Sequence, residues 1–390
     1  MKTRLKNVLK IGKSILKNVL FSLKGKYDKD IIVFTTEAIG DNLLFLDSFK
    51  GYERYAKENN RELTILCGEK MKNFWLENAT GENTEVVSVN VQNFKSFLGV
   101  ELSEFLSRMA CMRYDNVIVP MHHTTSLMLG AFLSAKRYMT IAYDEWLVNR
   151  TFLIDILYKT IYKDYIYAEK DLFIGQAFEK QVNHFDSAYK WKIGNTHCLN
   201  KERLIVDEYI LVAPIASCAD KSLSRRQIVK IADFLLKNTE EKIVLTANED
   251  KKEYFQEIVD ELKSARLWNY AGRTNFSQYI QLVNDAKFLI GCDSGSVHLA
   301  ASLNTQSIAL CGQWSGAYLP YKGAENHYAS PRCVFSNESM KCQFCMSNKG
   351  GIYKSNVVCY ERVQQGYNRL CLENVVLNDV FDEIKTLIKG

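Results

Sequence analysis

Short apolar runs alternate with longer amphipathic stretches along most of the chain. Runs such as residues 31–34, 210–213 and 288–290 are predicted to be buried strands, because they are short, apolar and bounded by polar turns. Residues 42–57 instead repeat their apolar side chains with the spacing of an amphipathic helix. Strands that alternate with such helices are typical of βαβ units, so the pattern predicts an α/β protein with parallel sheets.

A small polar turn, Asp293-Ser294-Gly295-Ser296, separates one predicted strand from a helix predicted at residues 297–303. The free N–H groups and positive dipole end of such a helix suit an anion, and Gly295 lets the backbone approach it closely. The turn therefore favours a phosphate or diphosphate ligand. Ser and Asp are also ordinary helix caps, and a lone histidine such as His298 is more often a packed helix residue than a catalytic one. Taken alone, the turn is therefore better explained as a plain cap than as a phosphate site.

A similar unit begins at Ile31, where a predicted strand is followed by the turn Glu37-Ala38-Ile39-Gly40-Asp41 and a helix. Asp41 is thus expected at the carboxyl end of a strand, the edge of an open α/β sheet at which ligands bind. A carboxylate in that place can act as a general base. The alternative interpretation of Asp41 by itself is again a helix N-cap.

Composition narrows the class of protein. A chain of 390 residues, 47% hydrophobic and 24% charged, is long and apolar enough for two domains with large cores. No G-x-G-x-x-G turn follows a predicted strand, which argues against a dehydrogenase. The chain also has neither a GxxxxGK[ST] phosphate loop nor an HExxH zinc motif.

The net charge of +5 is unevenly distributed. Residues 1–26 contain eight Lys or Arg and no acid, which leaves 42 basic and 45 acidic residues in the rest of the chain. The body of the protein is therefore slightly acidic, and nothing in it favours binding to nucleic acid.

The basic leader, residues 1–26, also carries apolar side chains at helical spacing. This combination predicts an amphipathic helix over residues 1–28 that lies on an anionic membrane surface. Lysines interrupt every apolar run, so the segment predicts neither a membrane span nor a signal peptide. The alternative is a helix that packs on the protein's own surface.

Eleven cysteines without a signal peptide indicate a reducing compartment. Most lie in apolar segments and are expected to be buried thiols. A separate group near the C-terminus could hold a structural zinc ion, although its irregular spacing favours free thiols. That group consists of Cys342, Cys345, Cys359 and Cys371.

The two turns together resemble a known family. The pattern AIGD at residues 38–41, followed far downstream by DSGSVHLAASL at residues 293–303, resembles glycosyltransferase family 9, the lipopolysaccharide heptosyltransferase family. The resemblance covers about residues 30–320. It implies a GT-B fold, in which two Rossmann-like domains with parallel sheets face each other across a cleft.

The resemblance also implies a division of the chain. Residues 29–195 are expected to form the domain that binds the acceptor, and residues 205–365 the domain that binds the sugar-nucleotide donor. Residues 366–390 are expected to form a helix that packs back on the N-terminal domain.

Individual residues receive roles by the same resemblance. It assigns Asp41 as the catalytic base, and His122 and His123 as contacts to the acceptor. The residues expected to bind the donor are Lys221 on the phosphates, Glu249 on the ribose, Gly272 and Arg273 beside the base, and Asp293, Ser294, Gly295, Ser296 and His298 around the polar turn. Glu37 stands where the family has a small or hydroxyl residue, and it could perturb Asp41 or bind an acceptor amine.

The activity implied is an inverting, metal-independent transfer of a sugar, with heptose from ADP-heptose as the expected donor. The expected acceptor is a lipid-linked glycan, either the lipopolysaccharide core or another surface glycan. No cofactor beyond the nucleotide sugar is expected, and the predicted location is the inner face of the cytoplasmic membrane. The alternatives are another GT-B enzyme of nucleotide sugars, such as an epimerase, and a non-catalytic module that binds sugar nucleotides.

Overall fold

The computed structural model describes most of the chain as two compact units. The first comprises residues 1–172 and 176–191, and the second comprises residues 173–175 and 192–390. The described residues are 29–91, 112–121, 123–143, 157–169, 172–195, 203–217, 221–312, 318–323, 329–336, 365 and 370–389. The basic leader, His122, Cys342, Cys345 and Cys359 lie outside them.

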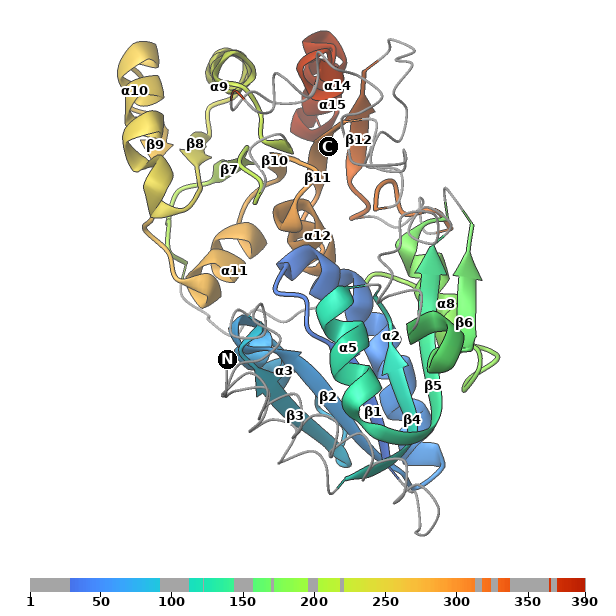
Figure 1. The fold of residues 1–390 in the computed structure, drawn as a ribbon. Coiled ribbons are helices and arrows are strands. Elements are labelled where there is room, and N and C mark those ends of the chain that lie inside the picture. Colours follow the sequence, from blue (N-terminus) through green and yellow to red (C-terminus); the bar gives the residue numbers. More distant parts are fainter. Residues whose placement is uncertain are drawn as a thin grey trace, which may run out of the picture. The chain divides into compact units, whose positions relative to one another are not determined.

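The first unit contains one parallel sheet of six strands (Figure 1). Its strands are β1 (Lys29–Phe34), β2 (Glu62–Gly68), β3 (Thr84–Val89), β4 (Arg113–Val119), β5 (Ser134–Tyr143) and β6 (Asp164–Ala168). Its helices are α2 (Ile39–Glu58), η1 (Glu69–Met71), α3 (Lys72–Asn78), α5 (Thr124–Phe132) and α8 (Ile174–Val182), the last starting in the short segment assigned to the second unit.

The strand order in this sheet is β3-β2-β1-β4-β5-β6, the order of a Rossmann fold. Successive residues of β1 point to opposite faces, as the two-residue repeat of a strand requires. Ile31 and Val33 pack in the cluster that contains α5. On the other face, the ring of Phe34 stacks on Phe45 of α2 and meets Phe178 of α8 edge-on. Burial on both faces explains why β1 is an uninterrupted apolar run.

The second unit repeats this architecture with its own six-stranded parallel sheet. Its strands are β7 (Tyr209–Ala213), β8 (Lys242–Leu245), β9 (Leu267–Asn269), β10 (Leu289–Cys292), β11 (Ser307–Cys311) and β12 (Arg332–Phe335). Its helices are α9 (Arg225–Asn238), η4 (Glu249–Lys251), α10 (Lys252–Leu262), α11 (Phe276–Asn284), α12 (Gly295–Ser302), α14 (Leu370–Glu373) and α15 (Leu377–Lys389). The spatial order, β12-β11-β10-β7-β8-β9, is again that of a Rossmann fold, read from the opposite edge.

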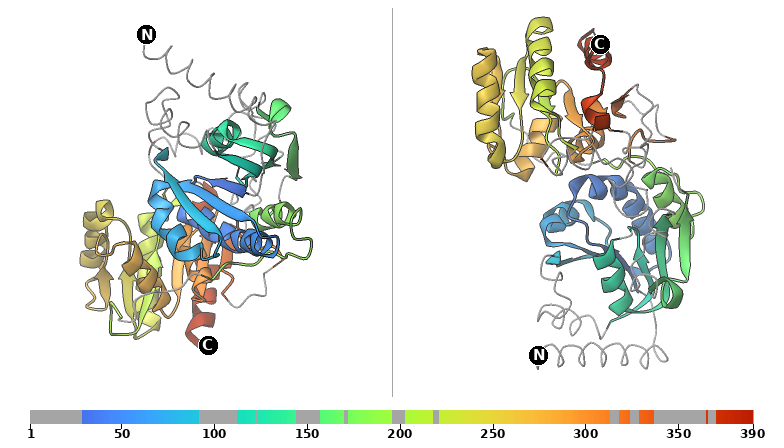
Figure 2. Two further views of the ribbon diagram at one scale, coloured as in Figure 1. Left: turned by 90° about the horizontal axis from the view of Figure 1, so that it is seen from below. Right: turned by 45° about the horizontal axis from the view of Figure 1, so that its top comes forward.

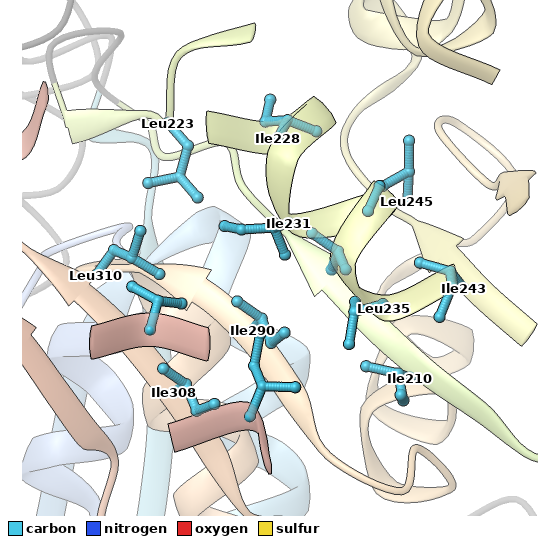
Figure 3. Packing of buried hydrophobic residues seen from close by; sticks show 14 of the residues in the cluster. Ile210, Leu223, Ile228, Ile231, Leu235, Ile243, Leu245, Ile290, Ile308 and Leu310 are labelled. Carbon is cyan, nitrogen blue, oxygen red and sulfur yellow. The ribbon is translucent and has the colours of Figure 1, made fainter. Parts of the chain in front are cut away.

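Apolar side chains from one face of this sheet and from α9, α10 and α15 form the core of the second unit (Figure 3). Ile210 and Val212 of β7 point into this cluster. The opposite face of the sheet is covered by α11. There, the Tyr209 hydroxyl of β7 donates a hydrogen bond to the Leu282 carbonyl at 2.7 Å. Helices therefore lie on both faces of the sheet (Figure 2).

Helix α15 corrects one expectation from the sequence. Its apolar stripe, formed by Val380, Ile384 and Leu387, is buried in the core of the second unit and not on the N-terminal domain. The ring of Phe381 stacks on Phe234 of α9 with centroids 4.1 Å apart. A helix at the end of a Rossmann unit can cover a face of its own sheet. The apolar stripe of α15 packs in this way on the second unit.

Among the described residues, no helix combines the length and the apolar character that a membrane span needs. The apolar helices of both units instead cover sheet faces, so their hydrophobic side chains are used in packing between layers.

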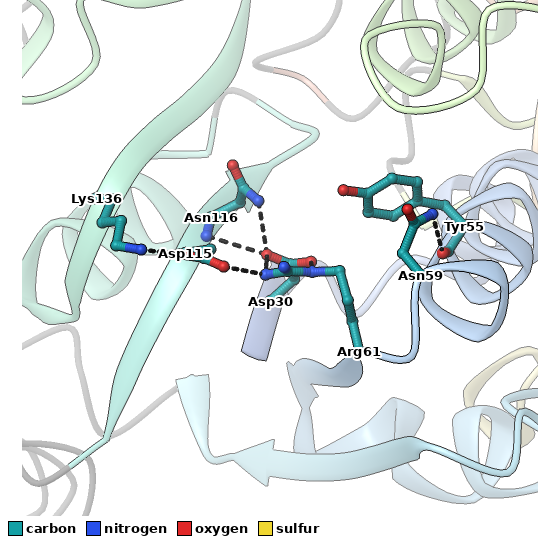
Figure 4. A network of polar contacts seen from close by, with 7 residues as sticks. All are labelled: Asp30, Tyr55, Asn59, Arg61, Asp115, Asn116 and Lys136. Atoms are coloured by element: carbon teal, nitrogen blue, oxygen red, sulfur yellow. Dashed lines mark hydrogen bonds and ion pairs between the residues drawn. The ribbon is translucent and has the colours of Figure 1, made fainter. Parts of the chain in front are cut away.

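A charged network ties together the starts of β1, β2 and β4 (Figure 4). Asp30 is 2% exposed and accepts hydrogen bonds from Nε of Arg61 at 2.6 Å and Nδ2 of Asn116 at 2.7 Å. Arg61 also binds Asp115, which pairs with Lys136 at 2.8 Å. Burial opposes the ionisation of Asp115, but its bonds to Lys136 and Arg61 outweigh burial and lower its pKa. This contribution to stability is therefore lost as the pH falls through that lowered pKa.

We expect Arg61→Met to destabilise the first unit by about 3 kcal/mol, because it leaves the buried Asp30 carboxylate without its cation. Hydrogen exchange of the β1 and β4 amides, followed as urea is added, measures the free energy of unfolding of the first unit separately from that of the second. Lys29→Met is the matched control, since Lys29 is the first residue of β1 and the change removes its more exposed ion pair with Glu62. That change should cost no more than about 1 kcal/mol. An equal loss of stability in the two variants would contradict the role of Arg61 as the cation that stabilises Asp30.

Candidate functional site

Each Rossmann sheet has one point where the strand order reverses. In the first unit this switch point lies between β1 and β4, and in the second it lies between β7 and β10. Connections leave the two strands in opposite directions there, so the carboxyl edge of the sheet stays open to a ligand. The residues that follow β1, β7 and β10 are therefore the first candidates for chemistry.

Asp41 lies beside the switch point of the first unit. It is the third residue of α2, whose N-cap is Ala38, so the alternative interpretation of Asp41 as the cap does not hold. Its Oδ2 atom accepts a hydrogen bond from the Thr36 hydroxyl at 2.9 Å. An acid in the first turn of a helix is also favoured by the helix dipole.

Two further polar residues predicted for this site have clear places in the structure. Glu37 forms an ion pair with Lys70 at 3.1 Å, so its carboxylate has a cationic partner from η1. His123 is exposed and is the N-cap of α5, but its side chain makes no capping hydrogen bond. Its imidazole is therefore not used to hold the helix end.

Lys221 and Asp293 meet at the switch point of the second unit. Lys221 follows β7, Asp293 follows β10, and the Lys221 ammonium lies 3.2 Å from Oδ2 of Asp293. Asp293 is 7% exposed and Lys221 is 20% exposed, so the pair is partly shielded from water. The structure thus brings together two residues that are 72 positions apart in sequence.

Helix α12 starts at the polar turn that the sequence singled out. Ser294 is its N-cap but makes no side-chain capping hydrogen bond, unlike Ser224 and Asn275, which form complete capping boxes at α9 and α11. Ser296, in the first turn, accepts a hydrogen bond from the Tyr279 hydroxyl at 2.7 Å. The start of α12 therefore has no side-chain cap, as the starts of α2, α5 and α10 also have none, and the N-terminus of a helix suits an anion.

His298 lies deeper in α12. It is 3% exposed, and its Nδ1 atom shares a hydrogen bond of 2.8 Å with the Tyr321 hydroxyl. Burial lowers the pKa of His298 to about 4, against an opposing effect of Asp293. The imidazole is therefore neutral near pH 7, and the cation of this region is Lys221.

A pocket of about 530 Å³ opens in the second unit at the carboxyl ends of its strands. This volume is within the range of sites for small molecules. Its walls come from the ends of β7 and β8, the loop after β9, and the starts of α11 and α12. Three predicted donor residues, Glu249, Gly272 and Ser296, line it. Arg273 is exposed nearby, with its guanidinium 5.6 Å from the centre of the Tyr270 ring.

Gly272 has a specific structural reason to be glycine. Its φ of +71° is in the left-handed region, and a Cβ atom there would lie 2.7 Å from Cβ of Glu249. The amide of Gly272 also donates to the Ala247 carbonyl at 3.0 Å. The loop after β9 is thereby held against the Glu249 loop, which fixes one wall of the pocket.

The motifs did not reveal every pocket residue. Thr246, Phe276 and Tyr279 also line the cavity. Phe276 is 41% exposed, so part of its ring is open to a ligand in the pocket. One available signal was the spacing of Asn275 and Gln278, a capping box that places Phe276 in the first turn of a helix after a strand.

Among the described residues, no group of three or more His, Cys, Asp or Glu side chains is placed to hold a metal ion. Cys371 is the one described member of the cysteine group that the sequence analysis considered for zinc. It is buried, and its sulfur packs against Gly312 at the end of β11.

Comparisons with known structures agree with this architecture. The ADP-heptose lps heptosyltransferase II of E. coli aligns over 92% of this chain and 98% of its own, with a TM-score of 0.60 and 15% identity. E. coli heptosyltransferase WaaC with ADP aligns over 87% and 99%, with a TM-score of 0.58 and 14% identity.

A third solved structure, the glycosyl transferase family 9 protein from Veillonella parvula, aligns over 94% of this chain and 99% of its own. Its TM-score is 0.62 and its identity is 15%. At such low identities these likenesses establish the fold, which is of the GT-B class. No curated protein matches this chain by sequence.

The sequence itself matches a family profile. Residues 108–348 match glycosyltransferase family 9 (heptosyltransferase), a span that includes the end of the first unit and the pocket of the second. The expectation drawn from the two turns is therefore confirmed. This chain belongs to glycosyltransferase family 9, and it is a heptosyltransferase-like glycosyltransferase.

Proposed function

We propose that this protein transfers heptose from ADP-heptose to the lipopolysaccharide core or to another surface glycan, with inversion at the anomeric carbon and without a metal ion. The observation that carries the proposal is the pocket of the second unit, whose Glu249, Gly272 and Ser296 are the expected donor contacts. The choice of donor is supported by WaaC, a similar structure that was solved with ADP.

The pocket offers a suitable surface for each part of such a donor. The Glu249 carboxylate can accept hydrogen bonds from ribose hydroxyls, while the exposed ring of Phe276 can stack on the base. The diphosphate is assigned to the start of α12, where Ser294 leaves the backbone N–H groups uncapped, and to the nearby Lys221 ammonium. These donors would stabilise the negative charge that forms as ADP departs.

The first unit would supply the base. In the proposed step, an acceptor hydroxyl oxygen bonds to the anomeric carbon as the bond between that carbon and the phosphate oxygen breaks. The hydroxyl proton passes to Asp41, and the bonding electrons leave with ADP. His122 and His123 are assigned to the acceptor. Glu37, four residues before Asp41, is paired with Lys70.

We also propose that the enzyme works at the inner face of the cytoplasmic membrane. The support is the leader of residues 1–26, with eight basic residues, no acid and apolar positions at helical spacing. A lipid-linked acceptor would be reached most directly by a protein held at that surface.

We expect Asp41→Asn to lower kcat about 1,000-fold, because an amide cannot accept the hydroxyl proton. The assay uses ADP-heptose with lipopolysaccharide from a bacterium with a truncated core. Glu58→Gln is the matched control, since it makes the same change on the exposed last residue of α2 and should leave kcat unchanged. An Asp41→Asn protein that retained a tenth of the wild-type kcat would refute the assignment of the base.

We expect Phe276→Ala to weaken ADP binding about tenfold, because it removes one stacked aromatic ring from the base. Phe276→Tyr keeps the ring and should bind ADP as the wild type does. Calorimetric titration with ADP and with pyrophosphate separates the parts of the ligand, since only ADP carries the base. A parallel loss of pyrophosphate binding would show that the substitution damages the pocket as a whole, contrary to the proposal.

A further inference from the structure

Two adjacent buried threonines follow β1, and their hydroxyl groups have different partners. Thr35 is 3% exposed, and its hydroxyl shares a hydrogen bond of 2.7 Å with the hydroxyl of Ser126 on α5. Thr36 is 8% exposed, and its hydroxyl donates to Oδ2 of Asp41 at 2.9 Å. Only the second hydroxyl contacts the carboxylate assigned as the base.

The Thr36 hydroxyl has a second hydrogen-bond partner in the same turn. The backbone N–H of Ala38 donates to the Thr36 hydroxyl oxygen at 3.3 Å. The Thr36 hydroxyl thus accepts a hydrogen bond from Ala38 and donates one to Asp41.

The backbone of the same turn is held by a buried amide. The side-chain nitrogen of Asn42 donates to the carbonyl of Thr36 at 3.2 Å and to that of Ala38 at 2.8 Å. The side-chain oxygen of Asn42 accepts from Nε1 of Trp75 at 2.7 Å. Asn42 and Trp75 are both 0% exposed. The turn before Asp41 is thus connected through Asn42 to the aromatic core.

A buried amide beside an indole is costly unless its hydrogen bonds are made, and a satisfied network of this kind holds one conformation. The network extends from Trp75 through Asn42 to the backbone of Thr36, whose hydroxyl then reaches Asp41. The hydrogen bond from Thr36 to Asp41 is the end of this network. The network therefore affects the orientation of the carboxylate as well as the stability of the turn.

We infer that Thr36 is a positioning residue, whose hydroxyl holds the Asp41 carboxylate in the orientation needed to take the acceptor proton, on a turn held in place by Asn42 and Trp75. The inference rests on the proposed role of Asp41 as the base. A positioning role of this kind affects the rate of the chemical step, because a small displacement of a catalytic group lowers that rate strongly.

The test compares Thr36→Val with Thr35→Val in the full chain. Both changes replace the hydroxyl of a buried threonine by a methyl group of similar shape, at adjacent positions, but only the first removes the bond to Asp41. We expect Thr36→Val to lower kcat by about tenfold or more with the KM for ADP-heptose unchanged. Thr36→Ser, which keeps the hydroxyl, should restore kcat to within about threefold of the wild type.

Thr35→Val should lower the melting temperature about as much as Thr36→Val but leave kcat unchanged. A kcat of Thr36→Val within twofold of the wild type, or an equal loss in Thr35→Val, would overturn the inference. If Thr36→Val does not fold, Thr36→Ala is judged by the same criteria. An active Asp41→Asn protein would refute the base itself, and this outcome is distinct from a failure of Thr36 alone.

Discussion

Parallel strands all end at the same edge of a sheet, and this constraint governs where chemistry can occur in this protein. In both units the strand order reverses once, between β1 and β4 and between β7 and β10. Helices cover the faces of the sheets, so the open place for a ligand is the carboxyl edge at the reversal. Asp41, Lys221 and Asp293 all follow strands that flank a reversal. The apolar strands thus determine where these polar residues lie, because the polar residues are in the segments that follow the strands.

The two switch points are built with different chemistry. In the second unit, the buried Asp293 is paired with Lys221, and burial keeps His298 neutral above a pKa of about 4. That unit therefore presents a cation and uncapped backbone N–H groups, which suit a diphosphate. In the first unit, the Thr36 hydroxyl donates to the Asp41 carboxylate, and the Asn42 amide holds the backbone of the turn before it.

Particular residues show where inference from the sequence stopped. Periodicity predicted the strand at 31–34 and the helix from 42, because burial on both sheet faces imposes an apolar run and helical packing imposes a repeat of three to four residues. The pattern did not show that every residue from 42 to 49 is buried in α2. The apolar stripe of α15 was equally visible, yet it was assigned to the wrong unit. A stripe reports that a helix is buried on one side, and it carries no information about which surface buries it. Phe276 was missed as a pocket wall because the capping box of Asn275 and Gln278 was not used to place it in the first turn of α11.

The sequence by itself determined the α/β class, the alternation of strands and helices, and the family, because local spacing and the two short motifs express them directly. Only the tertiary structure decided which distant residues meet. The ion pair of Lys221 with Asp293, the contact of Gly272 with Glu249, and the bonds from Trp75 through Asn42 to the turn before Asp41 each join separate segments. Such contacts depend on strand order and on the close packing of the layers, and neither is encoded by any single stretch of residues.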